Sequence, residues 1–176
     1  MVREINIYGN PVLNKKCVPC ELKEKQSFLS DVSDDSGSVW TDEVIELVND
    51  LKETAMSNAE NTLGLAAPQI WWKDTPCPAV FVVRVNNGNE AAPIYSFTEL
   101  INPKIKTSGK TIRPIEACLS VPNYAAPIKR ELNVTVSYQL LSGPEVYTSK
   151  LFGKHDMNAI VIQHEYDHLQ GKLIKK

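Results

Sequence analysis

Apolar residues spaced three and four positions apart predict an amphipathic helix over residues 41–57. The apolar positions are Val44, Leu47, Val48, Leu51 and Ala55. Thr41 precedes them as a suitable N-cap, and the two acids that follow it place negative charge where the helix dipole favours it. One face of this helix is therefore expected to pack on the core of the protein.

Short apolar runs, and runs in which apolar and polar residues alternate, predict strands along the rest of the chain. They are expected at residues 3–8, 79–85, 100–105, 132–138 and 145–152. The last two runs flank Ser142-Gly143-Pro144, which is a strong turn signal, so they should pair as a hairpin.

A second helix is predicted over residues 157–170, with Asp156 as its N-cap and Gly171 at its end. Apolar residues occupy nearly every side of it, which is typical of a buried helix. They are Ala159, Ile160, Val161, Ile162 and Leu169. Because the strands cluster between two distant helices, we expect an α+β fold, with mostly antiparallel sheets packed around the buried C-terminal helix.

Residues 26–40 are rich in Ser and Asp and include Gly37, a composition that predicts a surface-loop insertion. No internal repeat and no linker is found elsewhere, so residues 1–176 are expected to form a single domain. The length suffices to bury a sizeable core without disulfides.

Composition narrows the class of partner. Hydrophobic residues make up 43% of the chain, charged residues 23%, and the formal net charge is -2. Nucleic acid and anionic membranes are therefore not expected as partners, since proteins that bind them usually carry a basic excess. No apolar run approaches the roughly 20 residues that a membrane span needs. The first residues resemble no targeting signal, so a cytoplasmic protein is expected, or an organellar one if a transit peptide has been removed.

The candidate chemistry lies in the predicted C-terminal helix, at His164-Glu165-Tyr166-Asp167-His168. Residues four apart share one face of a helix, so both imidazoles can bind one metal ion. The glutamate between them can act as general base toward a water at that metal. A hydrogen-bonded pair of core histidines is the alternative interpretation.

A catalytic metal site usually needs a third protein ligand. The candidates are Cys17, Cys20, Cys77, Cys118, His155 and many carboxylates. Cys118 stands between an acid and a turn that ends in proline, but a buried structural cysteine would have the same spacing. The spacing alone therefore leaves the third ligand open.

Three motifs and the opening of the chain are similar to those of the peptide deformylases, which remove the formyl group from the N-terminal formyl-methionine of nascent polypeptides. The family motifs GxGLAAxQ, EGCLS and QHExDH correspond here to TLGLAAPQ at 62–69, EACLS at 116–120 and QHEYDH at 163–168. Residues 7–13, IYGNPVL, also match the opening of the family. The resemblance covers nearly the whole chain apart from the expected insertion.

The resemblance implies a role for each motif. The metal ligands would be Cys118, His164 and His168. Glu165 would be the catalytic acid and base, while the Gln69 side chain and the N–H of Leu119 would hold the formyl oxygen. The substrate pocket would be lined by Leu63, Gly64, Ala117, Ile160 and Val161, and Glu116 and Asp167 would orient the ligands. One divalent ion is implied, Fe²⁺ in the cell, with Zn²⁺, Ni²⁺ or Co²⁺ able to substitute, although the ligand chemistry alone would favour zinc.

The chain departs from the family pattern at a few positions. Thr62 and Ala117 replace glycines, and a positive φ at either position would cost about 1–2 kcal/mol. Ala125 stands where bacterial members often carry arginine, while Arg130 remains. Residues 1–176 also lack the further C-terminal helix of many bacterial members, so ribosome association is expected to be weak.

Two alternative functions are considered, and these departures motivate the first of them. One is a metallo-amidase of the same fold with a shifted N-acyl substrate. The other is a catalytically weak, metal-binding interaction protein.

Overall fold

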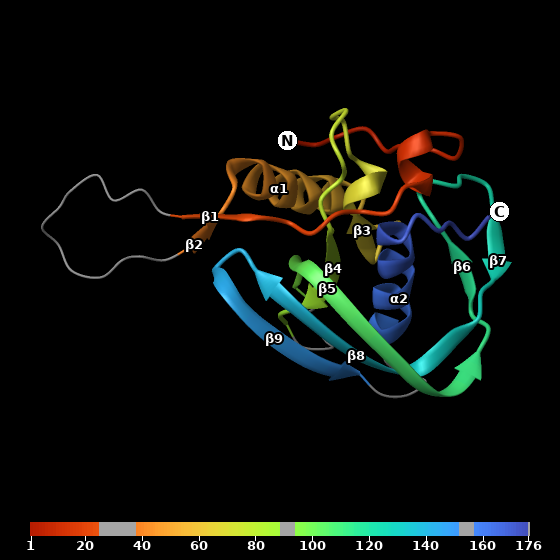
Figure 1. The fold of residues 1–176 in the computed structure, drawn as a ribbon. Helices are drawn as coiled ribbons and strands as arrows, with labels where there is room; N and C mark the ends of the chain where they lie inside the picture. Colours follow the sequence, from red (N-terminus) through yellow and green to blue (C-terminus); the bar gives the residue numbers. More distant parts are fainter. Residues whose placement is uncertain (25–37, 89–93, 152–156, 176) are drawn as a thin grey trace, which may run out of the picture.

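A five-stranded antiparallel sheet wraps around the C-terminal helix (Figure 1). The computed structural model describes residues 1–24, 38–88, 94–151 and 157–175. The strands of the sheet, in spatial order, are β3 (Gly64–Ala66), β4 (Val80–Asn86), β5 (Tyr95–Ile112), β8 (Arg130–Leu140) and β9 (Gly143–Leu151). Two small antiparallel sheets pair β1 (Leu22–Glu24) with β2 (Ser38–Trp40), and β6 (Ile115–Ala117) with β7 (Ala125–Pro127). The expected α+β class is confirmed.

The first helix, α1 (Asp42–Ser57), forms as its apolar spacing predicts. The Thr41 hydroxyl caps it by accepting a hydrogen bond from the Val44 N–H at 3.4 Å. All five apolar residues of the predicted stripe are buried. They pack against β4 and β5, so the stripe is the core-facing side of the helix.

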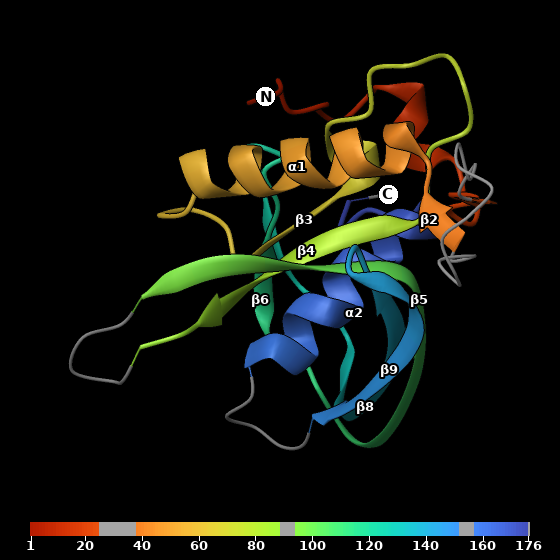
Figure 2. The ribbon, with the colours of Figure 1, turned by 90° about the vertical axis from the view of Figure 1, so that its left-hand side faces the viewer.

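The second helix, α2 (Met157–Leu169), lies on the opposite side of β4 and β5 from α1 (Figure 2). Residues 80–83 of β4 are therefore buried consecutively, because a helix covers each face of the strand. Gly171 has a φ of +68°, and the Lys172 N–H donates to the Asp167 carbonyl at 2.9 Å. This is the predicted glycine end of the helix. The predicted N-cap, Asp156, lies outside the described residues.

Three other predicted strands match the structure closely, and one is much longer than predicted. β4, β8 and β9 correspond to the predicted runs at 79–85, 132–138 and 145–152, and β8 pairs with β9 as the expected hairpin. β5 extends over 18 residues, whereas the apolar run predicted only 100–105. Its second half is exposed and polar, so it gives no apolar signal in the sequence.

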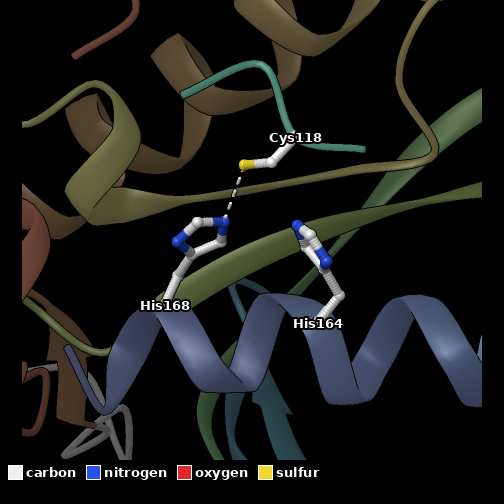
Figure 3. A group of neighbouring side chains, drawn as sticks. All are labelled: Cys118, His164 and His168. Atoms are coloured by element: carbon white, nitrogen blue, oxygen red, sulfur yellow. Dashed lines mark hydrogen bonds between the residues drawn. The ribbon is translucent and has the colours of Figure 1, made fainter. Parts of the chain in front are cut away.

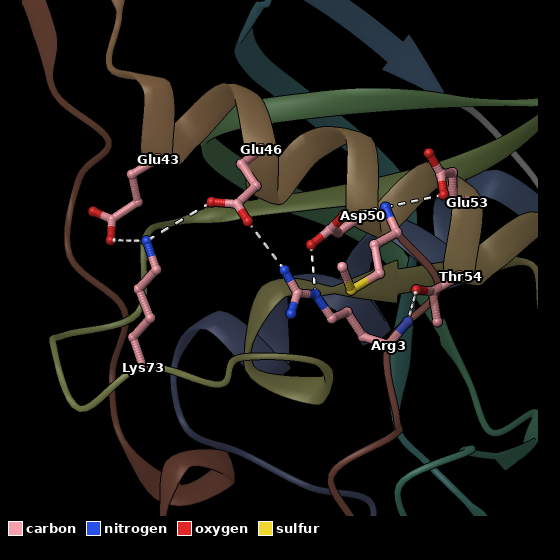
Figure 4. A network of polar contacts seen from close by, with 8 residues as sticks. Arg3, Glu43, Glu46, Asp50, Glu53, Thr54 and Lys73 are labelled. Atoms are coloured by element: carbon pink, nitrogen blue, oxygen red, sulfur yellow. Dashed lines mark hydrogen bonds and ion pairs between the residues drawn. The ribbon is translucent and has the colours of Figure 1, made fainter.

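The predicted strand at residues 3–8 is wrong. Among the described residues this segment pairs with no strand, and it bonds instead to α1 and to the 3₁₀ turn η2 (Ala67–Gln69). Arg3 binds the α1 carboxylates Asp50 at 2.6 Å and Glu46 at 3.1 Å (Figure 4). The segment is fixed by side chains and single backbone bonds, which an apolar pattern does not distinguish from sheet pairing.

The insertion predicted at residues 26–40 extends too far at its C-terminal end. Residues 25–37 lie outside the described residues, but Ser38–Trp40 forms β2. Trp40 is 2% exposed, and its indole N–H donates to the Leu140 carbonyl at 2.8 Å. Among the described helices, none is long and apolar enough to cross a membrane.

Candidate active site

A cleft of about 700 Å³ opens between β3, β6 and α2. Its walls combine apolar side chains with a few buried polar groups. The predicted site residues that line it are Leu63, Gly64, Gln69, Glu116, Ala117, Cys118, Leu119, Ile160, Val161, His164 and Glu165. Three segments that are distant in sequence therefore meet at one concave surface, as is typical of a small-molecule or peptide site.

Three side chains that could hold a metal ion lie close together, and two of them, Cys118 and His164, line this cleft. His164 and His168 project from successive turns of α2 toward Cys118, which follows β6 (Figure 3). Their ligand atoms all lie within 4.8 Å of one another, and Cys118 Sγ is 3.3 Å from His168 Nε2. A tetrahedral site with bonds of 2.0–2.3 Å places its ligand atoms roughly 3.5 Å apart. One thiol and two imidazoles at these separations fit a single divalent ion.

The other three cysteines do not join this group. Cys17, Cys20 and Cys77 are buried in the hydrophobic core, and burial raises the pKa of the Cys20 thiol to about 12. Within the described residues, Cys118 completes the only group of three metal-binding side chains. His155 lies outside the described residues.

A chain of ion pairs fixes the orientation of His164. Its Nδ1–H donates to Glu116 at 2.8 Å, which leaves Nε2 for a metal. Arg130 donates two hydrogen bonds to Glu116, at 2.7 and 2.8 Å, and one to Asp167, at 2.6 Å. Burial alone would raise the pKa of Glu116, but the bonds from Arg130 and His164 outweigh it and lower that pKa to about 2.

Glu116 and Asp167, the two carboxylates expected to orient the metal-binding residues, differ in how they are connected to His164. Glu116 contacts His164 directly, whereas Asp167 is linked to Glu116 and His164 through Arg130. Arg130 is 5% exposed and does not line the large cleft, so it lies behind the site instead of facing a peptide. It lines a small cavity of about 40 Å³, together with His164, Asp167 and His168.

Glu165 is buried against the backbone of β3. The side chain is 4% exposed, and one carboxylate oxygen, Oε2, has no hydrogen-bond partner among the described residues. Burial raises its pKa to about 7. Gly64 permits this close approach, because a Cβ at that position would lie 2.8 Å from Glu165 Cγ. A carboxyl group in such surroundings can take up and release a proton near neutral pH.

The Gln69 amide is held in one orientation by its neighbours. Its Oε1 accepts from the Ala66 N–H at 2.8 Å, so its NH₂ group points to the opposite side. Nε2 donates to the Ser120 hydroxyl at 3.2 Å and lies 3.6 Å from Cys118 Sγ. The donor therefore lies beside the metal-binding group before any substrate arrives.

Several residues of the site were not found by sequence reasoning. Ser120 holds Gln69, and the cleft walls also include Asn61, Pro114, Ile115, Pro122 and Asn123. Ser120 lies within a motif and was detectable there. The wall residues have no chemical signature, because only the fold brings them to the cleft.

The fold and the cleft, with its Cys/His/His group, define the class of the protein as a metal-dependent hydrolase. The family model for polypeptide deformylase matches residues 2–176, and the chain belongs to this family. Members of the family remove the N-formyl group from nascent peptides.

Individual relatives and solved structures similar to this chain are also peptide deformylases. The chain is 35% identical to the peptide deformylase of Pseudothermotoga lettingae, in a match that covers 98% of this chain and 81% of the relative. The crystal structure of peptide deformylase from Thermotoga maritima superposes with a TM-score of 0.68 at 30% identity, covering 99% and 95% of the two chains. A Met-Ala-Ser-bound structure of the class I type b enzyme from Acinetobacter baumannii gives 0.69 at 25% identity, covering 98% and 96%.

Proposed function

We propose that the chain deformylates the N-terminal formyl-methionine of nascent polypeptides with Glu165 as acid and base and with Cys118, His164 and His168 holding the metal. One observation carries this assignment: the three candidate ligand atoms lie within 4.8 Å of one another, and two of their residues, Cys118 and His164, line the same cleft as Glu165 and Gln69. A divalent ion held there acts, when bound, as a Lewis acid toward water and the formyl oxygen.

The protein groups have separate tasks in the reaction. Glu165 accepts a proton from the attacking water and later delivers it to the leaving amine. The Gln69 NH₂ group and the Leu119 N–H donate hydrogen bonds to the oxygen on which negative charge develops. The locked orientation of the Gln69 amide supports this role, because a fixed donor needs no reorganisation during the reaction.

The walls of the cleft support an apolar, extended substrate. Leu63, Gly64, Ala117, Ile160 and Val161 would surround the methionine side chain. Within the described residues, β3 pairs only with β4 and β6 only with β7, so each strand offers a free edge to a peptide backbone. The Acinetobacter baumannii relative was solved with the peptide Met-Ala-Ser bound.

The metal proposed for the cell is ferrous iron, with zinc, nickel or cobalt able to replace it. Thiolate and imidazole ligands support all four ions, since these donors bind divalent first-row metals in general. Metal analysis of protein purified without air, followed by exchange with each ion, tests this assignment.

A weak association with the ribosome is also proposed, because the substrates are nascent chains. Sedimentation with and without ribosomes tests it. Protein that stays in the supernatant at every ribosome concentration contradicts it.

The decisive experiment compares formate release from formyl-Met peptides with acetate release from acetyl-Met peptides, using protein loaded with nickel or with ferrous iron under anaerobic conditions. Wild type should cleave the formyl substrate. Glu165→Gln should lose activity by at least about 10²-fold while keeping its metal, because only the proton acceptor changes. Glu145→Gln, at an exposed glutamate of the β8–β9 hairpin, serves as the matched control.

Cys118→Ser tests the third ligand and should lose bound metal. Unchanged metal content and activity in this variant would show that another residue holds the ion. Faster turnover of the acetyl than of the formyl peptide by wild type would instead reject the substrate assignment.

A further inference from the structure

The amino-terminal segment joins the two turns that carry catalytic groups. The Asn6 N–H donates to the Gln69 carbonyl at 2.7 Å. Two residues later, the Tyr8 N–H donates to the Ser120 carbonyl at 2.7 Å. One extended strip of backbone therefore bonds to both η2 and the turn after Cys118. The start of this strip is fixed on α1 by the Arg3 side chain, which pairs with Glu46 and Asp50, and by the Arg3 N–H, which donates to Thr54 (Figure 4).

The Asn6 side chain adds a clamp around Gln69. Its Nδ2 donates to the Pro68 carbonyl at 2.9 Å and to the Trp71 carbonyl at 3.0 Å, while its Oδ1 accepts from Asn10 at 2.9 Å. The amide thus uses two donor hydrogens and its oxygen in one arrangement. Aspartate lacks the donors, and leucine has a similar size but no polar atoms.

We infer that Asn6 is a positioning residue for Gln69. It binds the backbone carbonyl before Gln69, the carbonyl of Gln69 itself and a carbonyl two residues later. These bonds fix the backbone from which the Gln69 side chain reaches the site, and the Ala66 N–H fixes the amide at its far end. The inference rests on the proposed role of Gln69 as an oxyanion donor, which requires the donor to keep its place within about 0.5 Å.

A double-mutant cycle separates this role from a general contribution to folding. Asn6→Leu, Gln69→Ala and the double variant are compared with wild type for the kcat and KM of formate release. If Asn6 acts through Gln69, Asn6→Leu should lower kcat about tenfold or more in wild type, with KM within twofold. It should lower kcat less than twofold in the Gln69→Ala background, where the positioned donor is already absent.

The controls cover folding and metal binding. Metal content should stay unchanged in Asn6→Leu, because the hydrogen bonds of the Asn6 side chain go to Pro68, Trp71 and Asn10 and to none of the proposed metal ligands. Asn87→Leu removes an exposed amide that donates to Ser96; neither residue lines the cleft, so this variant should leave kcat unchanged. Asn6→Ala replaces Asn6→Leu in the cycle if the leucine variant does not fold.

Two outcomes overturn the inference. An equal loss of kcat in both backgrounds would mean that Asn6 acts independently of Gln69, and an unchanged kcat would mean that the clamp is dispensable. Absence of formate release from wild type would instead reject the proposed function, so the two failures are distinguishable.

Discussion

Gly64→Ala should remove most of the activity without unfolding the protein. The added Cβ would lie 2.8 Å from Glu165 Cγ, 2.8 Å from Glu165 Oε1 and 2.9 Å from Val161 Cγ1. Optimal separations between carbon atoms are about 3.5–4.0 Å, so the overlap is at least roughly 0.6 Å. The backbone at Gly64 does not have a positive φ, so alanine strains nothing except these contacts. Glu165 must therefore move.

A displacement approaching 1 Å at a catalytic group costs about 10²-fold in rate, whereas overpacking costs only about 1–3 kcal/mol of stability. We therefore expect kcat for formate release to fall about 10²-fold, with metal content unchanged and a modest loss in urea denaturation. Gly143→Ala is the matched control, because the three atoms nearest to its Cβ would all belong to the flexible carboxylate of Glu145. A folded Gly64→Ala protein whose kcat stays within twofold of wild type would refute the reasoning.

Two further predictions concern ion pairs with a buried carboxylate, Glu116 or Glu99. Arg130→Met should destabilise the protein by about 3–5 kcal/mol and weaken metal binding about 10–100-fold, because Glu116 stays buried without its cation and Asp167 loses its partner. Urea denaturation measures the stability, and competition with a chelator measures the metal affinity. Unchanged values would contradict both expectations. Lys52 lies 2.5 Å from the buried carboxylate of Glu99, and although burial opposes it, this bond with others lowers the pKa of Glu99 below 4.5. The stability from this shift is present above pH 4.5 and is lost as the pH falls through the lower, folded-state pKa. Lys52→Met should therefore be less stable than wild type at pH 7, and the difference should shrink below pH 4.5. A stability difference that stays constant with pH in urea denaturation would contradict the assignment.

The sequence predicts well those features that depend on residues close together in the chain. The stripe of α1 and the i, i+4 histidines of α2 follow from helical periodicity, and both are observed. Gly171 ends α2 as expected, because few other residues adopt its backbone conformation easily.

Features that depend on tertiary structure could not be predicted in this way. Cys118 and His168 are 50 residues apart, and periodicity gives no reason to choose Cys118 over Cys17 or Cys77. The family motif pointed to Cys118, and the geometry brings it to the histidines. The apolar pattern at residues 3–8 is typical of a strand, but it carries no information about whether another strand lies beside it.

The backbone conformation and the position of Thr62 and Ala117 explain why this chain can carry them where the family pattern has glycine. Among the described residues, the only non-glycine residues with a positive φ are Asn102 and Asn123, so neither Thr62 nor Ala117 pays a conformational cost. The Thr62 hydroxyl donates to the Gly64 carbonyl at 2.5 Å, and it therefore braces the strand that touches Glu165. Ala117 is exposed and adds a methyl group to the cleft wall. Both residues therefore add side-chain atoms to the wall of the cleft at positions that do not need glycine's backbone freedom.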